Sequence, residues 1–340
     1  MTAAAEHGLV ALHGSSPDVG VVGYTLGGGM GWLARSHGLA ANSVLAVELV
    51  TADGRLVRAD RDNEPDLFWA LRGGGGSFGV VTAIEFALCP LREVYAGVLF
   101  FPIERAAEVL GAWRRWVDGV PETVTSVGRL LRLPPFPEIP EPIRGRDFVV
   151  VEAAMQDGEA AGRELLRPLR ELGPELDSFA TVPAAALGSL HMDPEQPVPG
   201  EGHGMLLDDV TGEAIERLVA AAGAESGSTL LSAELRHLGG ALAEPSPEHG
   251  AVGAIDAGFA YFAVGIAPTP AAKVVTREQV QRTIDALAPW DAGRAYLNFS
   301  ERPTAGGSLF SEQAHRRLQR IKTRVDPGDV IRANQRVRPA

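Results

Sequence analysis

A glycine-rich run near the start of the chain is the segment whose composition points most directly to chemistry. Residues Gly20–Gly31 read Gly-Val-Val-Gly-Tyr-Thr-Leu-Gly-Gly-Gly-Met-Gly, with six glycines in twelve positions. Glycine is unfavourable inside helices and strands, so such a density is typical of backbone that approaches a ligand closely. Bare backbone N–H groups bind phosphates, and a flat cofactor ring can lie against them. The run predicts a phosphate- or cofactor-binding segment, with a tight loop between packed elements as the alternative.

A second glycine cluster, Gly74–Gly79, matches the spacing G-x-G-x-x-G. In a dinucleotide-binding fold this fingerprint follows a strand and opens a helix. Here the apolar stretch Leu67–Leu71 predicts a helix before the cluster, and a β-branched stretch predicts a strand after it. The order of elements therefore excludes a nicotinamide-binding Rossmann motif. The chain also has no G-x-x-x-x-G-K-[ST] sequence that would indicate a nucleoside triphosphatase.

Length and composition limit the classes of protein that remain. The chain has 340 residues, of which 45% are hydrophobic and 22% charged, which suits a globular protein with two domains. Its net charge of −12, without a Lys/Arg cluster, argues against nucleic acid or an anionic membrane as a partner. No apolar run approaches the roughly 20 residues that span a bilayer, and the first residues do not form a secretion signal. We therefore expect a cytoplasmic location.

The elements that position these segments are predicted from hydrophobic periodicity and turn residues. A hairpin is expected over 44–58, a short helix over 67–71 and a strand over 78–88. From about residue 94 the order strand–helix–strand–strand occurs twice, which predicts an α+β layer in which helices cover one face of an antiparallel sheet. Residues 173–202 are expected to form a loop. The expected strands of this layer are 94–101, 124–133, 148–155, 202–209, 229–236, 257–266 and 294–299, and the expected helices are 104–117, 158–172, 212–222, 276–287 and 311–324.

Several motifs, taken in order, resemble the flavin-binding domain of FAD-linked oxidases of the berberine-bridge-enzyme type, within the wider vanillyl-alcohol-oxidase group. They are Gly20–Gly31, Val50-Thr-Ala-Asp-Gly54, Pro65–Gly76 and Phe78–Thr82, with Tyr296-Leu-Asn298-Phe299 and Arg332-Ala-Asn334 near the end. The resemblance implies a PCMH-type FAD-binding domain, here incomplete, plus a substrate domain. It places the C-terminal half of the FAD domain at 1–93, the substrate domain at 94–300 and a returning segment at 301–340.

The same resemblance implies FAD as cofactor, a small-molecule substrate and a set of site residues. In such enzymes a carbon–heteroatom bond is oxidised by hydride transfer to flavin N5, with O2 as the expected acceptor. Tyr296 would be the catalytic residue that positions or deprotonates a substrate hydroxyl, the alternative being a sheet residue with a solvated hydroxyl. The residues expected along the diphosphate and isoalloxazine are Gly20, Gly23, Thr25, Gly27, Gly28 and Gly31, those at the adenosine half are Gly79 and Val81, and those that reach the flavin from the C-terminal segment are Tyr296, Asn298 and Asn334.

Two departures from the family pattern concern the covalent flavin links. The sequence contains no Arg-x-Gly-Gly-His segment, whose histidine bonds to the flavin in relatives. Ser16 stands where doubly linked relatives have a cysteine, and serine cannot form that thioether. We therefore expect neither tether in this chain. The alternative hypothesis is a truncated, flavin-less remnant without activity, or a subunit that a complementing chain or a second copy of this chain completes.

The remaining candidates give weaker signals. His191, His203, His237 and His249 are too scattered for a metal site, so no metal is expected and surface or hydrogen-bonded roles are favoured. Arg236 and His237 are neighbours on an expected strand, so at most one of them can face a cleft. Cys89, the only cysteine, ends an apolar stretch and predicts a buried thiol.

Overall fold

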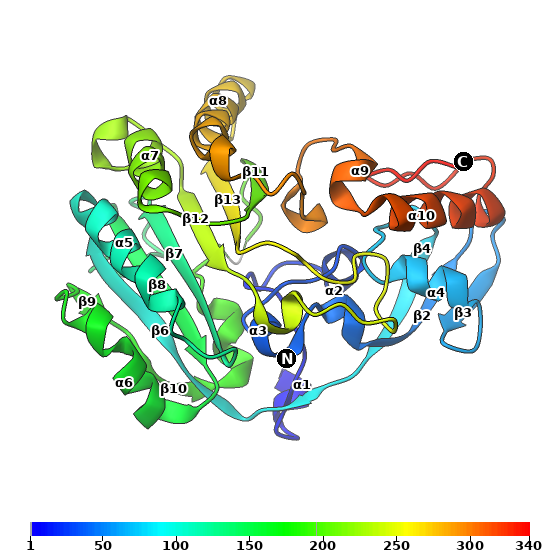
Figure 1. The fold of residues 1–340 in the computed structure, drawn as a ribbon, viewed down its shortest axis with the longest axis horizontal. Helices are drawn as coiled ribbons and strands as arrows, with labels where there is room; N and C mark the ends of the chain where they lie inside the picture. The colour runs from blue at the N-terminus through cyan, green and yellow to red at the C-terminus, as the bar shows by residue number, and fades with distance from the viewer. Residues whose placement is uncertain (1, 195) are drawn as a thin grey trace.

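The computed structural model describes residues 2–194 and 196–340, and within them the strands form two main sheets. A large antiparallel sheet of eight strands occupies one end of the molecule, and a small antiparallel sheet of three strands occupies the other (Figure 1). The glycine-rich segment lies between them, and the chain's last residues lie at the end that holds the small sheet. This arrangement confirms the predicted α+β class.

The long helices that pack on the large sheet all cover the same face (Figure 1). Side chains alternate between the two faces of a strand. Leu130, Leu235 and Tyr261 accordingly point toward the helices and are fully buried in the main core. The strand order is β10-β6-β8-β7-β12-β13-β11, with β9 paired to β6. The strands are β6 (Glu93–Pro102), β7 (Val124–Arg132), β8 (Asp147–Met155), β9 (Leu176–Asp177), β10 (Ala180–Pro183), β11 (Gly200–Leu207), β12 (Ser232–His237) and β13 (Phe259–Ile266), and the covering helices are α5 (Ala106–Val117), α6 (Gly158–Arg170), α7 (Gly212–Ala222) and α8 (Pro270–Leu287).

The small sheet is formed by β2 (Val44–Val50), β3 (Leu56–Asp60) and β4 (Val80–Phe86), in the order β3-β2-β4. Helix α4 (Pro65–Leu71) and the C-terminal helix α10 (Glu312–Val325) pack near it, and their apolar side chains share one core with those of β2. The shorter elements are α1 (Thr2–Ala5), β1 (Leu9–Val10), α2 (Val21–Leu26), α3 (Ala34–His37), β5 (Cys89–Pro90), α9 (Gly306–Leu309) and the 3-10 turns 40–43, 103–105, 184–189, 224–226, 240–242, 288–290 and 297–299.

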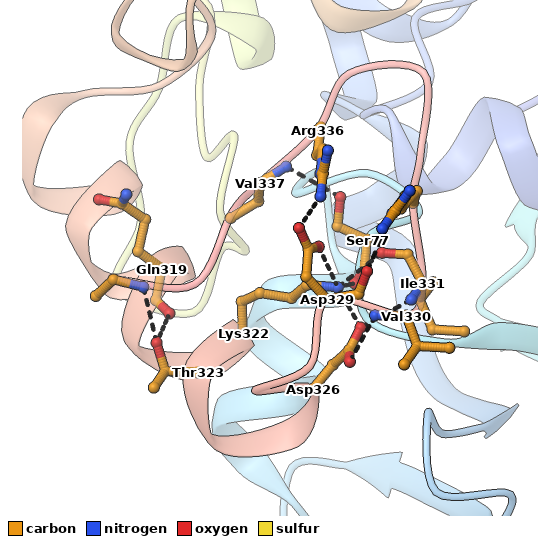
Figure 2. Close-up of polar contacts among 12 residues, drawn as sticks. Ser77, Gln319, Lys322, Thr323, Asp326, Asp329, Val330, Ile331, Arg336 and Val337 are labelled. Atoms are coloured by element: carbon orange, nitrogen blue, oxygen red, sulfur yellow. Dashed lines mark hydrogen bonds and ion pairs between the residues drawn. The ribbon is translucent and has the colours of Figure 1, made fainter.

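The chain's last residues are held near the glycine cluster at 73–76 by a buried lysine (Figure 2). Lys322 of α10 donates from Nζ to Asp326 Oδ2 at 2.5 Å and to the carbonyl oxygens of Ser77 and Ile331, each at 2.7 Å. The Asp326 carboxylate in turn accepts from the backbone N–H groups of Val330 and Ile331. The lysine therefore fixes the path of the last segment, which carries Asn334.

Three local predictions are wrong. The expected strand 294–299 is instead an irregular segment with a 3-10 turn, because Tyr296 O accepts from Phe299 N at 3.0 Å rather than from a neighbouring strand. Residues 173–202 are not all loop, since they contain β9, β10 and the start of β11. Cys89 lies in β5 and is half-buried rather than buried. The boundaries at 93 and 300 stay predictions. None of the helices in the described residues is long and apolar enough to cross a bilayer.

Candidate functional site

A cavity of about 1340 Å³ lies between the glycine-rich segment, the C-terminal segments and the face of the large sheet that is opposite helices α5–α8. It exceeds the roughly 300–1,000 Å³ typical of a pocket for one drug-sized ligand. The walls include Gly20 and Gly23 on one side, Arg236 on the sheet, and Tyr296 and Asn334 from the returning segments. The cavity therefore has room for a large cofactor together with a substrate.

The wall beside α2 is open where two of the predicted glycines lie. A Cβ atom built on Gly20 or on Gly23 would meet no protein atom within 4 Å, and both residues line the cavity. Gly75 and Gly76 continue this bare wall, with Asn334 beside them. Backbone without side chains is what a diphosphate or a flat ring needs for close approach. The residues present therefore fit FAD.

Other glycines of the run are required by packing within the protein. A Cβ on Gly27 would collide with the Asn298 Oδ1 atom, and one on Gly31 would collide with the His13 carbonyl oxygen. Gly28 has a φ of 114°, which side-chain-bearing residues rarely adopt. Of these three glycines, Gly27 also lines the cavity. The glycines of this run therefore have two roles. Some leave the cavity wall bare, and Gly27 allows close contact with the segment that carries Asn298.

Three further predicted cofactor residues lie away from the cavity wall. Thr25 is buried on the inner side of α2. Gly79 precedes β4, where a Cβ would lie 2.6 Å from Leu49 Cδ1, and Val81 lies within β4. None of the three lines the large cavity. The contacts expected of Gly79 and Val81 with the adenosine half stay a prediction.

Tyr296 lies in the cavity wall with only 3% of its surface exposed. Asn298 donates from Nδ2 to the Tyr296 hydroxyl oxygen at 3.2 Å and to the Tyr24 carbonyl oxygen at 2.9 Å. Asn298 therefore ties the returning segment to α2 and orients the phenol. Burial raises the pKa of Tyr296 well above its ordinary value, against weaker opposing effects that include the nearby Arg236. The alternative of a sheet tyrosine with a solvated hydroxyl is wrong.

The deep end of the cavity contains a buried ionic network that the sequence did not predict. Arg129 and Glu234 lie directly opposite each other on β7 and β12, and Glu152 projects from β8 on the same face. His191, which follows the 3-10 turn 184–189, inserts between the two carboxylates. Its Nδ1 lies 2.5 Å from Glu152 Oε2 and its Nε2 lies 2.7 Å from Glu234 Oε2. Arg236 donates from Nε to Glu234 Oε1 at 2.6 Å. We call these five residues the ionic network.

The network favours the charged forms of its two carboxylates and of His191. Burial and Arg129 lower the pKa of His191, but the two carboxylates outweigh them and the pKa lies above its ordinary value. Burial raises the pKa of Glu234, but Arg236, His191 and Arg129 hold it well below its ordinary value. The pKa of Glu152 is likewise lowered by Arg129 and His191 against the effect of burial. The two carboxylates thus favour the protonated imidazole of His191, against Arg129, whose Nη1 lies 2.7 Å from His191 Nε2.

Strand alternation separates Arg236 from its neighbour, as expected. Arg236 lines the large cavity, whereas His237 points to the opposite side and stacks near Phe259. Burial lowers the pKa of His237 to about 3, so this imidazole is neutral. In the part of the chain that the structure describes, no group of three or more His, Cys, Asp or Glu residues is placed to hold a metal ion.

The sequence contained a signal for part of the network. Glu152 interrupts the otherwise apolar stretch Val149–Met155, and Glu234 and Arg236 share one strand face by spacing alone. A carboxylate inside an apolar strand indicates a buried partner. His191 carried no such signal, because 39 to 62 residues separate it from Glu152, Glu234 and Arg129 along the chain.

Comparison with known proteins supports the cofactor and the fold. Residues 1–60 match the model of the FAD binding domain family. The chain is 27% identical over 351 aligned residues to YvdP, an FAD-linked oxidoreductase of Bacillus subtilis (strain 168), an alignment that covers 99% of this chain and 74% of that protein.

Solved structures agree. 6-Hydroxy-D-nicotine oxidase from Arthrobacter nicotinovorans superposes with a TM-score of 0.83 at 23% identity, over 100% of this chain and 76% of that one. A variant of berberine bridge enzyme superposes with a TM-score of 0.78 at 19% identity, over 98% of this chain and 73% of that one. The predicted resemblance, fold, enzyme class and cofactor are confirmed. The chain is thus an FAD-dependent oxidoreductase that is related to the FAD-linked oxidoreductases and has the fold of the berberine-bridge-enzyme type.

Proposed function

We propose that this protein oxidises a carbon–heteroatom bond of a small organic substrate. The chemistry that FAD supplies when bound is acceptance of a hydride at its N5 atom and delivery of the electrons to O2. The observation that carries the proposal is one cavity with two unlike walls. A bare glycine wall faces a tyrosine hydroxyl and a polar cluster, so cofactor and substrate can meet in the same space.

The glycine wall is the proposed binding surface for FAD. Gly20 and Gly23 would lie against the diphosphate and the ring system, where their bare backbone permits close approach. Asn298 and Asn334 would bound the flavin from the returning segments. Lys322 holds the last of these segments in place through its three bonds.

Tyr296 is the proposed acid–base residue. Its hydroxyl oxygen, held by Asn298 Nδ2, would bind the substrate hydroxyl and take its proton as the carbon is oxidised. Because burial raises the pKa of Tyr296, the phenolate is a minor form at neutral pH, and proton removal becomes faster as the pH rises. Relatives of this fold include an oxidase named for 6-hydroxynicotine, a small heterocyclic compound, which is consistent with a small organic substrate here.

The experiment that tests the proposal separates cofactor binding from turnover. The purified chain is mixed with FAD and passed through a gel-filtration column, and the flavin that elutes with protein is measured. A panel of alcohols and amines is then added without O2, and loss of visible flavin absorbance reports reduction. Re-oxidation on admission of air, with stoichiometric hydrogen peroxide, supports O2 as acceptor. A chain that retains no FAD contradicts the proposal.

A further inference from the structure

The substrate wall of the cavity divides into an apolar stretch and a charged end. The apolar stretch is formed by alternate residues of neighbouring strands and by the proline-rich segment after β7. Its members on the sheet are Leu131, Phe262, Val264 and Ile266, and those beyond the sheet include Leu133 and Phe136. A hydrocarbon or aromatic body fits such a surface because its burial is favourable. The charged end is the ionic network.

The ionic network carries an excess of positive charge when His191 is protonated. Arg129 and Arg236 supply two cations, Glu152 and Glu234 supply two anions, and a protonated His191 adds a third cation. All five are buried or nearly so: the side chain of Arg236 is 12% exposed, and the other four are 4% or less. An unbalanced buried charge is costly unless a counter-charge joins it. The network therefore favours an anion at the cavity end.

Arg236, like Arg129, is a cation of the network that lines the cavity. Its Nε is bound by Glu234 and its Nη2 donates to Ser15 Oγ at 3.1 Å, while its Nη1 has no hydrogen-bond partner among the described residues. The guanidinium carbon lies 5.3 Å from the ring centre of Phe299, and the Phe299 and Tyr296 rings are 5.3 Å apart. A group bound to Arg236 would thus lie on the same side of the cavity as the tyrosine.

We propose that the substrate is an amphipathic organic acid, whose carboxylate is bound by Arg236 and whose apolar body lies along Leu131, Phe262 and Val264. This inference rests on the proposed function, and it names the substrate class of the same site. A guanidinium binds a carboxylate through directed, charge-assisted hydrogen bonds, which a neutral amide cannot match. Arg236 therefore determines specificity and takes no part in proton transfer.

Asp193 is the competing source of negative charge. It lines the cavity, and the described residues include no ion-pair partner within 4 Å of its carboxylate. Burial raises its pKa, so a neutral form is favoured relative to a free carboxyl group. If Asp193 supplied the balancing charge instead, the cavity would prefer a neutral or cationic ligand.

The test compares three ligands of matched shape by titration calorimetry on the FAD-loaded protein. The ligands are 3-phenylpropionate, 3-phenylpropionamide and 3-phenylpropylamine. We expect the acid to bind roughly 10- to 150-fold more tightly than the amide, the range for a hydrogen bond to a charged group. Equal binding of acid and amide, tighter binding of the amine, or no binding of the acid at millimolar concentration would overturn the inference.

Variants assign the effect to its residue. Arg236→Gln should remove the preference for the acid, whereas Arg217→Gln, on the exposed face of α7, should retain it. Asp193→Asn should leave the preference for the acid in place, because burial already favours the neutral form of Asp193. The ligand comparison in the unmodified protein remains decisive if Arg236→Gln fails to fold. A protein that retains FAD and is reduced by substrates but prefers the amide contradicts only this inference, whereas loss of FAD contradicts the proposed function.

Discussion

Replacement of Gly23 by alanine separates the effect of a side chain on protein stability from its effect on the affinity for FAD. Gly23 lies within α2, its φ is outside the left-handed region, and a Cβ there would meet no protein atom within 4 Å. Alanine in a helix is more stable than glycine by about 0.5–1 kcal/mol, because the unfolded chain loses less freedom on folding. The variant without cofactor should therefore be as stable as the parent or slightly more stable.

The same methyl group would occupy space that we assign to FAD. Forcing one methyl group into a close-packed contact costs about 1–3 kcal/mol. That free energy corresponds to a roughly 5- to 150-fold weaker affinity for FAD. The two effects of Gly23→Ala thus have opposite signs, which a general disturbance of the fold would not produce.

Gly111→Ala provides the matched control. Gly111 lies in α5, on the helix-covered side of the large sheet, and its added Cβ would make an ordinary contact 3.5 Å from Arg115 Nη1. It should gain similar stability and leave FAD affinity unchanged. Urea unfolding of the apoprotein and fluorescence titration with FAD measure the two quantities. Unchanged FAD affinity in Gly23→Ala would refute the assignment of this wall to the cofactor.

Three further predictions concern single side chains. Tyr296→Phe should retain FAD and lower kcat by about 10²–10⁴-fold. Because burial raises the pKa of Tyr296 above the ordinary tyrosine value, the parent rate should still be rising with pH at about pH 10, whereas the variant should lack this rise; steady-state rates across pH measure both. Lys322→Met should lower the free energy of unfolding by about 3–5 kcal/mol, because it leaves the buried Asp326 carboxylate without its cation. The surface variant Lys273→Met should lose little stability in the same urea titration. The pKa of His191 is higher in the folded state than in the unfolded state, so its contribution to stability is complete below about pH 6.5 and is lost as the pH rises through the raised pKa. The free energies of unfolding of the parent and of His191→Gln, measured in urea, should therefore converge at alkaline pH. A difference that stays constant with pH would contradict the charged network.

Local sequence patterns predicted most of the elements well. Helix α7 spans the expected residues, 212–222, because Thr211 caps its N-terminus and one apolar stripe faces the sheet. The strands β7 and β8 begin or end within a residue of their expected positions, since each has a continuous apolar stretch bounded by turns. These features depend on neighbours in sequence, so the sequence alone was sufficient.

Features that depend on distant contacts were not predicted. The segment 294–299 contains two aromatic residues but no β-branched one. Its conformation depends on Asn298, which donates a hydrogen bond to Tyr24 on a helix 274 residues earlier in the chain. His191 has a charged environment only because the fold brings three strands to it. The glycine run predicts a ligand-binding segment, with a tight loop between packed elements as the alternative. Packing against Asn298 and His13 accounts for Gly27 and Gly31, so the alternative holds for these two glycines.

The two faces of the large sheet explain how one layer can be both core and active site. On β7, β12 and β13, the side chains on the helix-covered face include Leu130, Leu235 and Tyr261. They are apolar, because a charged group there would lack both water and a partner. The side chains on the cavity face include Arg129 and Glu234. These charged residues tolerate burial because their strands place them opposite each other. A shift of one residue in register would exchange the two sets and put the charges into the helix-covered core. The same apolar core that stabilises the sheet therefore also fixes the register that assembles the ionic network, so substitutions on the cavity face can change the substrate without repacking the core.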